Sequence, residues 1–356
     1  MRVRYGPATV NGYEIHKAPL GNWEGVEIRL SRESGDLSGV EISPSFRGRR
    51  MVKFLAKRGE FFMKKLVLVF LVLLAISAAM AIELVDDLGR LVSIDKTPGR
   101  VVIASPAITY YLELLDVTHT IVGVTDWDSF ALSREVTKIG NLTPLNLEMV
   151  LSLEPDLVLI SGGIQEVEVE KLERMGVNVF VVNPNSFEDI YRNLTVLGNI
   201  FAIPERGRKV ATDFRNGVLE VAKDVYNVPQ EERPKVMYIM IAGSVSDIWT
   251  CGTGSFVNQA IAYAGGANVA APYSGNNGWF PVSPEFVLNT QPDVILVPYY
   301  YEGGQREAVE MITSYKPFAE VPAVKNGRVY PISDSLTAYA NPRFIDLVKT
   351  LKEYFY

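Results

Sequence analysis

The chain contains the stretch Asn146-Leu-Glu-Met-Val-Leu-Ser-Leu-Glu-Pro-Asp-Leu-Val-Leu-Ile160 and returns to it as Ser283-Pro-Glu-Phe-Val-Leu-Asn-Thr-Gln-Pro-Asp-Val-Ile-Leu-Val297. In both copies an Asn or Ser that can cap a helix stands two residues before a Glu, and apolar residues follow at helical spacing. The Pro-Asp pair ends the helix, and the run of Val, Leu and Ile after it is typical of a buried parallel strand. Two copies of a helix–strand unit predict two similar α/β lobes, each with a Glu at the start of an equivalent helix.

Residues 63–81 have the pattern of a secretory signal peptide. A basic start at Met63 is followed by an uncharged run from Leu66 to Ala79 and by the small-residue site Ala79-Met-Ala81. A buried core helix is the weaker alternative, because the run is apolar on all sides. An uncleaved membrane anchor stays open, although the run is short for a typical span. We therefore expect an exported protein, either periplasmic or at the outer face of the cytoplasmic membrane, where an uncleaved signal would tether it.

Residues 1–62 precede this signal and carry scattered Gly, Arg and Glu without a sustained period. Because a signal peptide belongs at an N-terminus, we predict that they are an upstream extension from a start codon assigned too early. The expected start is Met63 or Met51.

The charge of the chain argues against a nucleic-acid partner. It carries 35 Lys and Arg and 41 Asp and Glu; 13 of the basic and 7 of the acidic residues fall within 1–81, which leaves 22 and 34, or a net charge of −12. Such a surface repels phosphate backbones. Beyond residue 81 the chain keeps one His, His119, and one Cys, Cys251. A zinc site built from His or Cys therefore lacks its ligands, and we expect Cys251 to be a small buried hydrophobe.

Strands alternate with helices on both sides of a long helical segment. This order predicts a mainly parallel sheet flanked by helices in each lobe. The segment 186–226 reads as nearly continuous helix with one break at Pro204, and its second part predicts a stiff connection between the lobes. The predicted organisation is an extension at 1–62, a signal peptide at 63–81, an N-terminal lobe at 82–203, an inter-lobe helix at 204–228 and a C-terminal lobe at 229–356.

Aromatic residues are concentrated in the loops that should open between the lobes. Ligands of α/β sheets bind beyond the carboxyl ends of the strands, which predicts a shared cleft. Aromatic rings on loops rich in Gly and Asn suit a large, flat, partly apolar ligand, although any one of them can instead cover the core. The candidate ligand contacts are Trp127, Trp249, Tyr273, Trp279, Tyr300, Asp334 and Tyr339.

No catalytic motif accompanies these candidates. The sequence has no Gly-x-Ser-x-Gly elbow, no P-loop and no complete dinucleotide fingerprint. We therefore expect a binding protein and not an enzyme, with no catalytic residue, bound metal or cofactor of its own.

An ordered series of motifs resembles the extracytoplasmic substrate-binding proteins of ABC importers for ferric siderophores, haem or vitamin B12, whose two lobes are joined by one rigid helix. The resemblance covers residues 86–356. The series comprises Arg100-Val-Val-Ile-Ala-Ser-Pro106, Val122-Gly-Val-Thr125, Asn146-Leu-Glu148, Gly254-Ser-Phe256, Ala264-Gly-Gly-Ala-Asn-Val269, Val282-Ser-Pro-Glu285, Asn326-Gly-Arg-Val-Tyr330 and Asn341-Pro-Arg343.

The resemblance implies a role for the repeated Glu. In that family a surface Glu of each lobe docks into arginine pockets of the two permease subunits, and these positions fall on Glu148 and Glu285. Carboxylate–arginine pairs are directional, which suits docking across a two-fold axis. The alternative is that both are first-turn carboxylates favoured by the helix dipole.

The resemblance does not identify a single ligand. Vitamin B12 binders resemble the chain around Gly278-Trp-Phe-Pro-Val-Ser-Pro-Glu285 and Ser333-Asp334, but a pocket tryptophan of those proteins falls near Leu142 and a basic residue has become Ala338. Cobalamin and a ferric siderophore both stay open, and haem is disfavoured because no His is placed to ligate iron, although a Tyr could do so.

The leading hypothesis is a monomeric binding protein that captures a metal chelate and delivers it to an ABC permease dimer with its ATPase subunits. The alternatives are an exported enzyme or chelatase on the same scaffold, and a membrane-tethered sensor of the same ligand.

Overall fold

The computed structural model describes residues 8–10, 13–15, 30–31, 81–128, 135–245 and 247–356. The chain divides into two units, Met1–Ser77 and Ala78–Tyr356. In the first unit a small antiparallel sheet joins β1 (Ala8–Val10), β2 (Tyr13–Ile15) and β3 (Leu30–Ser31). The predicted signal peptide lies, apart from Ala81, outside the described residues. Within the described parts of the chain, no helix is both long and apolar enough to cross a membrane.

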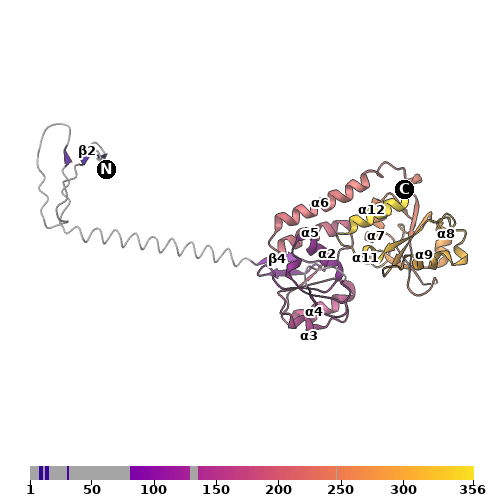
Figure 1. Cartoon of the computed structure of the whole chain (residues 1–356), viewed down its shortest axis with the longest axis horizontal. Helices are drawn as coiled ribbons and strands as arrows, with labels where there is room; N and C mark the ends of the chain where they lie inside the picture. Colours follow the sequence, from indigo (N-terminus) through magenta and orange to yellow (C-terminus); the bar gives the residue numbers. More distant parts are fainter. Residues whose placement is uncertain (1–7, 11–12, 16–29, 32–80, 129–134, 246) are drawn as a thin grey trace. The chain divides into compact units, whose positions relative to one another are not determined.

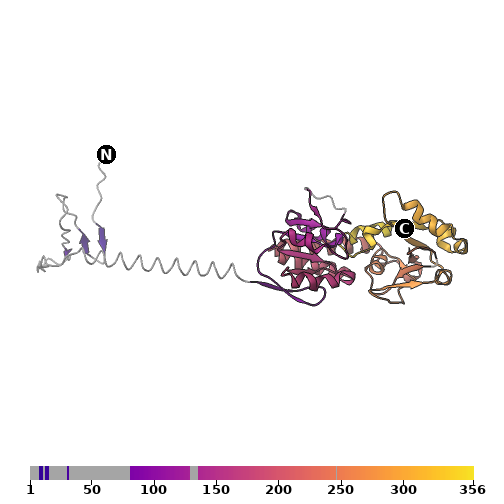
Figure 2. The same cartoon turned by 90° about the horizontal axis from the view of Figure 1, so that it is seen from below.

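The N-terminal lobe holds a five-stranded parallel sheet in the order β10-β9-β6-β7-β8. Figures 1 and 2 show the helices of this lobe packed around its strands. Alternate residues of its central strands enter different cores. Val101 and Ile103 lie in one core with α2 and α5, while Val102 lies in another with α3 and α4. The sheet is therefore covered by helices on both faces, as the sequence predicts. The elements are β6 (Val101–Ile103), α2 (Pro106–Leu115), β7 (Ile121–Val124), β8 (Thr137–Lys138), α3 (Leu147–Ser152), β9 (Leu157–Ile160), α4 (Glu166–Arg174), β10 (Val179–Val181) and α5 (Phe187–Ile200).

The C-terminal lobe repeats this plan with a four-stranded parallel sheet in the order β14-β11-β16-β17. Val236 and Leu296 face the core shared with α7 and α12, and Met237 and Ile295 face the core that includes α8 and α9. The elements are β11 (Lys235–Tyr238), α7 (Phe256–Tyr263), β14 (Ala267–Asn268), α8 (Pro284–Thr290), β16 (Val294–Tyr299), α9 (Gln305–Thr313), α10 (Pro322–Lys325), β17 (Val329–Ser333), α11 (Asp334–Thr337) and α12 (Phe344–Phe355).

Two antiparallel elements were not predicted. After β11 the chain passes directly into β12 (Met240–Ile241), which joins β13 (Ile248–Cys251) and β15 (Trp279–Val282) in an antiparallel sheet. A hairpin of β4 (Ile82–Val85) and β5 (Leu91–Ile94) precedes the first parallel strand. Short 3₁₀ turns complete the elements at Thr118–Thr120, Gly163–Gln165, Gln230–Glu232 and Lys316–Phe318.

The sequence repeat is also a structural repeat. Asp156 accepts hydrogen bonds from the N–H groups of Gly99 and Arg100 (2.8 and 3.0 Å), and Asp293 accepts one from that of Lys235 (2.8 Å). Each Asp therefore ties its strand to the start of the neighbouring one, β6 or β11. The residue before each repeated Pro has a positive φ, 46° at Glu154 and 47° at Gln291.

The segment between the lobes is a helical hairpin and not a nearly continuous helix. The helices α5 and α6 (Pro204–Lys223) pack along each other. They can do so because their glycines meet: a Cβ on Gly198 would lie 2.6 Å from the Cα of Gly207. The helix α6 begins at Pro204, as predicted, and contacts both α2 and the C-terminal helices α7 and α12 (Figure 1). Its 20 residues span about 30 Å.

Aromatic rings join the two lobes beside α6. Phe187 of α5 stacks on Phe214 of α6 with ring centroids 5.3 Å apart, and it lies 5.3 Å from Tyr263 and 5.8 Å from Phe344. The Phe187 N–H also donates to Oε1 of Gln259 in α7 (2.7 Å). One hydrophobic core therefore runs from the N-terminal sheet through these rings into the C-terminal sheet.

Candidate ligand-binding site between the lobes

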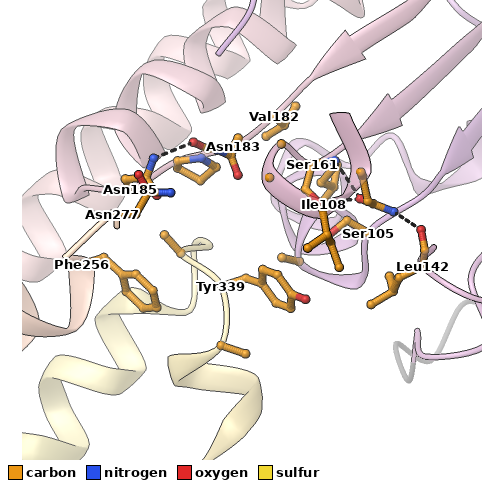
Figure 3. A pocket seen from close by; sticks show the side chains of 18 of the residues that line it. Ser105, Ile108, Leu142, Ser161, Val182, Asn183, Asn185, Phe256, Asn277 and Tyr339 are labelled. Atoms are coloured by element: carbon orange, nitrogen blue, oxygen red, sulfur yellow. Dashed lines mark hydrogen bonds between the residues drawn. The ribbon is translucent and has the colours of Figure 1, made fainter. Parts of the chain in front are cut away.

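A cavity of about 270 Å³ lies between the lobes (Figure 3). On the N-terminal side its wall includes Ser105, Ser161 and Asn183. Ser161 directly follows β9, while Ser105 and Asn183 each stand two residues after the end of a strand, β6 and β10 respectively. On the other side it is lined by Phe256 and Tyr339 among others. The predicted cleft beyond the carboxyl ends of the strands is therefore present in the structure.

Gln165 organises the N-terminal wall. Its Oε1 accepts a hydrogen bond from the Ser161 N–H (3.1 Å), and its Nε2 donates to the carbonyl oxygens of Ala104 (2.7 Å) and Leu142 (2.8 Å). Gln165 is buried, and these bonds hold three separate loops together (Figure 3). The sequence did not identify Gln165 as part of the site, because nothing in the local pattern indicates its distant partners.

The segment Asn183-Pro-Asn185 forms the adjoining part of the wall and is held from behind. Asp87 accepts a hydrogen bond from the Asn183 N–H (2.6 Å), and Asp189 accepts one from the Asn185 N–H (3.1 Å). Arg192 bridges both carboxylates at 2.5 and 2.6 Å. Burial alone would raise the pKa of Asp189, but hydrogen bonds from Ser186 and the Asn185 N–H, together with Arg192, lower it. This segment follows closely after β10, and its position beyond the end of a strand could have identified it as part of the site.

Trp279 is placed on the opposite wall by a tight glycine turn. Gly278 has a φ of +80°, and a Cβ there would lie 2.3 Å from the Ser255 nitrogen, so only glycine fits. The turn leads into β15, which begins at Trp279; the indole is half-buried and meets the Tyr238 ring edge-on with centroids 5.4 Å apart. The sequence placed Trp279 in a loop, but it lines the cavity from the first position of a strand.

Tyr339, Asp334 and Tyr300 form a second group on the C-terminal side. Tyr339 lines the cavity and is 41% exposed. Burial is the larger cause that raises the pKa values of Tyr339 and Tyr300, and the negative charge of Asp334 adds to it in both cases. Burial also raises the pKa of Asp334 itself. Three of the predicted ligand residues are therefore electrostatically coupled, and one of them lines the cavity.

Replacing Asp334 by Asn is expected to raise the midpoint of thermal unfolding at pH 7, because the folded protein disfavours the charged carboxylate. As the pH falls through the raised pKa of folded Asp334 towards the ordinary value of 3.8, the folded wild-type protein takes up the proton more readily than the unfolded chain. The wild-type protein gains stability in this window, and its difference from Asp334→Asn should shrink. Melting curves from pH 7 to pH 3 measure this.

Asp156→Asn is a control for which the opposite change in stability is expected. A hydrogen bond from Lys96 is the main cause that lowers the pKa of Asp156. This variant should be less stable than wild type at pH 7, with a difference that shrinks on acidification. A lower midpoint for Asp334→Asn at pH 7 would contradict the assigned cost of its burial.

The remaining aromatic candidates do not line the cavity. Trp127 is 66% exposed, and its Nε1 lies 3.4 Å from Oδ1 of Asn141, the residue before the cavity-lining Leu142. Trp249 is half-buried in β13. Tyr273 packs edge-on against Phe286 of α8, with centroids 5.3 Å apart.

Both departures from the vitamin B12 binders fall on this cavity. Leu142 and Ala338 line it, from the N-terminal and the C-terminal side respectively. Leu142 therefore provides an aliphatic side chain where the resemblance implies a tryptophan, and Ala338 provides a methyl group where it implies a basic residue.

Glu148 and Glu285 occupy the second position of α3 and α8, and both are exposed. Asn146 caps α3, since its side chain accepts a hydrogen bond from the Met149 N–H (3.1 Å). Ser283 does not cap α8 in this way. A hydrogen bond from the Ser283 side chain to Glu285 is instead the main cause that lowers the pKa of that carboxylate. The two Glu are equivalent in place although their caps differ.

Two further residues with potentially reactive side chains remain, Cys251 and His119. Cys251 is buried, and its burial raises the pKa of the thiol to about 12, in line with the expected small hydrophobe. His119 is exposed in a 3₁₀ turn. Among the described residues, no group of three or more His, Cys, Asp and Glu side chains could hold a metal ion.

Two α/β lobes, connected by α6 and with a cavity between them, define a two-lobed binding protein. A sequence profile described as periplasmic binding protein matches residues 101–336, well over half of the chain. The chain belongs to this periplasmic binding protein family.

Known proteins similar to this chain agree with that placement. It is 26% identical over 270 residues to the uncharacterized ABC transporter substrate-binding lipoprotein YvrC of Bacillus subtilis, covering 74% of this chain and 82% of that protein. It is 26% identical over 262 residues to the vitamin B12-binding protein of Vibrio parahaemolyticus, covering 72% and 89%. The apo structure of the periplasmic heme-binding protein RhuT from Roseiflexus sp. RS-1 matches with a TM-score of 0.62 and 25% identity, covering 72% and 97%. The predicted family and fold class are thereby confirmed.

Proposed function

We propose that this protein is the extracytoplasmic substrate-binding component of an ABC importer: it captures a metal chelate in the cavity between its lobes and delivers it to the permease. The observation that carries this proposal is the cavity itself, which is lined by residues of both lobes and lies at the carboxyl ends of the parallel strands of the N-terminal lobe. Family membership and the ABC transporter and vitamin B12 relatives support it.

The chemistry of the cavity favours a chelate of low net charge. Its described lining residues are apolar side chains, hydroxyls, amides and glycines, without a charged group. The nearby Asp334 and the acidic surface add negative potential. The absence of charge from this lining matches cobalamin and a neutral ferric tris-hydroxamate, whereas a ferric tris-catecholate or the propionates of haem would bring anionic groups to it without a cationic partner.

Ligand-induced stabilisation tests this proposal. Cyanocobalamin, a ferric tris-hydroxamate, a ferric tris-catecholate and haem are each added to the purified protein, and the unfolding midpoint is measured. One of the first two should raise it, because a ligand that binds only the folded state stabilises that state. No shift with any of the four would overturn the proposed substrate class.

Trp279→Ala should weaken binding of the stabilising chelate by about 100-fold, because a large aromatic contact to the ligand is lost. Trp249→Ala is the matched control: the same side chain is removed from the same antiparallel sheet, but at a position that does not line the cavity. Its dissociation constant should stay within a few-fold of wild type. Equal losses in the two variants would contradict a direct contact by Trp279.

We further propose that Glu148 and Glu285 dock the protein onto a permease dimer that works with ATPase subunits. Their equivalent exposed positions, one in each lobe, support this assignment. A charge-reversal experiment described below separates delivery from the alternative of a sensor, because only delivery makes uptake depend on both carboxylates.

A further inference from the structure

Tyr111 lines the cavity and carries an unpaired hydroxyl. It lies on the same face of α2 as Ala107 and Ile108, and all three residues line the cavity. Tyr111 is 1% exposed, and within the described part of the chain its hydroxyl has no hydrogen-bond partner. A buried hydroxyl without a partner lowers the stability of the folded protein, so its retention on a binding cavity points to a ligand that satisfies it.

The surroundings of Tyr111 define which kind of ligand group can do so. Asp87, Asp189 and Arg192, the groups that hold the Asn183–Asn185 wall, all act on it electrostatically. Burial is the main cause that raises the pKa of Tyr111 well above its ordinary value, so the hydroxyl keeps its proton and can donate it. Two carboxylates face one guanidinium here, and that guanidinium is already engaged by both. An anionic ligand group would therefore meet an unfavourable field, whereas a neutral acceptor would not.

We propose that Tyr111 is a specificity-determining residue of the cavity, whose hydroxyl donates a hydrogen bond to a neutral oxygen of the bound chelate, such as a carboxamide or hydroxyl oxygen. This inference rests on the proposed function and adds to it a named contact on the N-terminal wall. The aromatic candidates drawn from the sequence did not include this residue.

The test compares Tyr111→Phe with Tyr110→Phe. Both variants lose one phenolic hydroxyl from adjacent residues of α2, but Tyr110 does not line the cavity and lies against the guanidinium of Arg343, 5.5 Å from the ring centroid. Two quantities are measured for each: the unfolding midpoint without ligand, and the dissociation constants for cyanocobalamin and a ferric tris-hydroxamate by calorimetry.

Tyr111→Phe should unfold without ligand at the same or a higher temperature than wild type, since no hydrogen bond is lost. Its dissociation constant for the bound chelate should rise about tenfold, the usual effect of one neutral hydrogen bond. Tyr110→Phe should bind as wild type does.

Two results would overturn the inference: an unchanged dissociation constant for Tyr111→Phe, or a ligand-free variant that unfolds at a lower temperature, which would mean that the hydroxyl has a structural partner. If the wild-type protein binds neither probe, the proposed function fails, and the role of Tyr111 fails with it. Binding by wild type with equal binding by Tyr111→Phe rejects the inference alone.

Discussion

Reversing both repeated carboxylates, by Glu148→Arg combined with Glu285→Arg, is expected to abolish uptake of the ligand by cells while leaving the affinity of the purified protein unchanged. Removing one partner of a close charge pair costs about 2–5 kcal/mol of binding. Losing two such pairs lowers docking affinity by roughly three orders of magnitude or more. Neither residue lines the cavity, so the ligand should bind as before.

The fold should tolerate this double variant. Both side chains are exposed in the first turn of their helices, where replacing a carboxylate by a cation costs about 0.3–1 kcal/mol through the helix dipole. The hydrogen bond from the Ser283 side chain lowers the pKa of Glu285 and so favours the ionised carboxylate, the form that docking onto an arginine requires.

The matched control is Glu205→Arg combined with Glu310→Arg. It makes the same change in net charge at exposed carboxylates, one of which also lies in the first turn of a helix. Uptake by this control should remain close to wild type. Full uptake by the Glu148/Glu285 variant would exclude docking through these residues, and a loss of ligand affinity would place them in the binding site instead.

Phe187→Ala combined with Phe344→Ala is expected to lower the unfolding midpoint strongly and to replace one thermal transition with two. Each ring is nearly fully buried in the core between the lobes, and truncating such a ring costs about 3–5 kcal/mol. For a protein of this size, a loss of about 3 kcal/mol lowers the unfolding midpoint by about 6 °C. The transition should split because these rings connect the two sheets within one core.

Phe318→Ala provides the comparison. Phe318 is fully buried in the core that contains α9 and one face of the C-terminal sheet, away from the junction of the lobes. Calorimetry should show a similar loss of stability within a single transition. A single transition for the Phe187/Phe344 variant would mean that α6 alone couples the lobes. We expect the wild-type lobes to tilt only slightly, since both the helix and the rings oppose a wide opening.

The fold was largely predictable because its signals are local. The two repeats became α3–β9 and α8–β16, and Pro204 marked the start of α6. The hairpin of α5 and α6 was not predictable in the same way, because it depends on the meeting of Gly198 and Gly207, which are nine residues apart and on different helices. The antiparallel sheet of β12, β13 and β15 was not predicted for a similar reason. Its strands pair with partners elsewhere in the chain, and no local periodicity indicates such pairing.

The site was predictable in location but only partly in composition. Two of the candidate ligand contacts, Trp279 and Tyr339, line the cavity, and Asn183 and Asn185 could have been added from the rule that ligands lie beyond strand ends. Gln165 could not have been added, because its role depends on hydrogen bonds to residues that are distant in sequence. Tyr111 could not have been added either, because only the folded structure shows that its hydroxyl has no partner among the described residues.

The repeat by itself determined that there are two equivalent lobes and that each presents a Glu at the same place, because helix caps, Pro-Asp boundaries and apolar runs act within a few residues. Only the tertiary structure decided which side chains face the cavity and which cover the core. Burial and hydrogen-bond satisfaction are properties of the assembled lobes, as Trp249 in a strand off the cavity and Tyr111 on its wall illustrate.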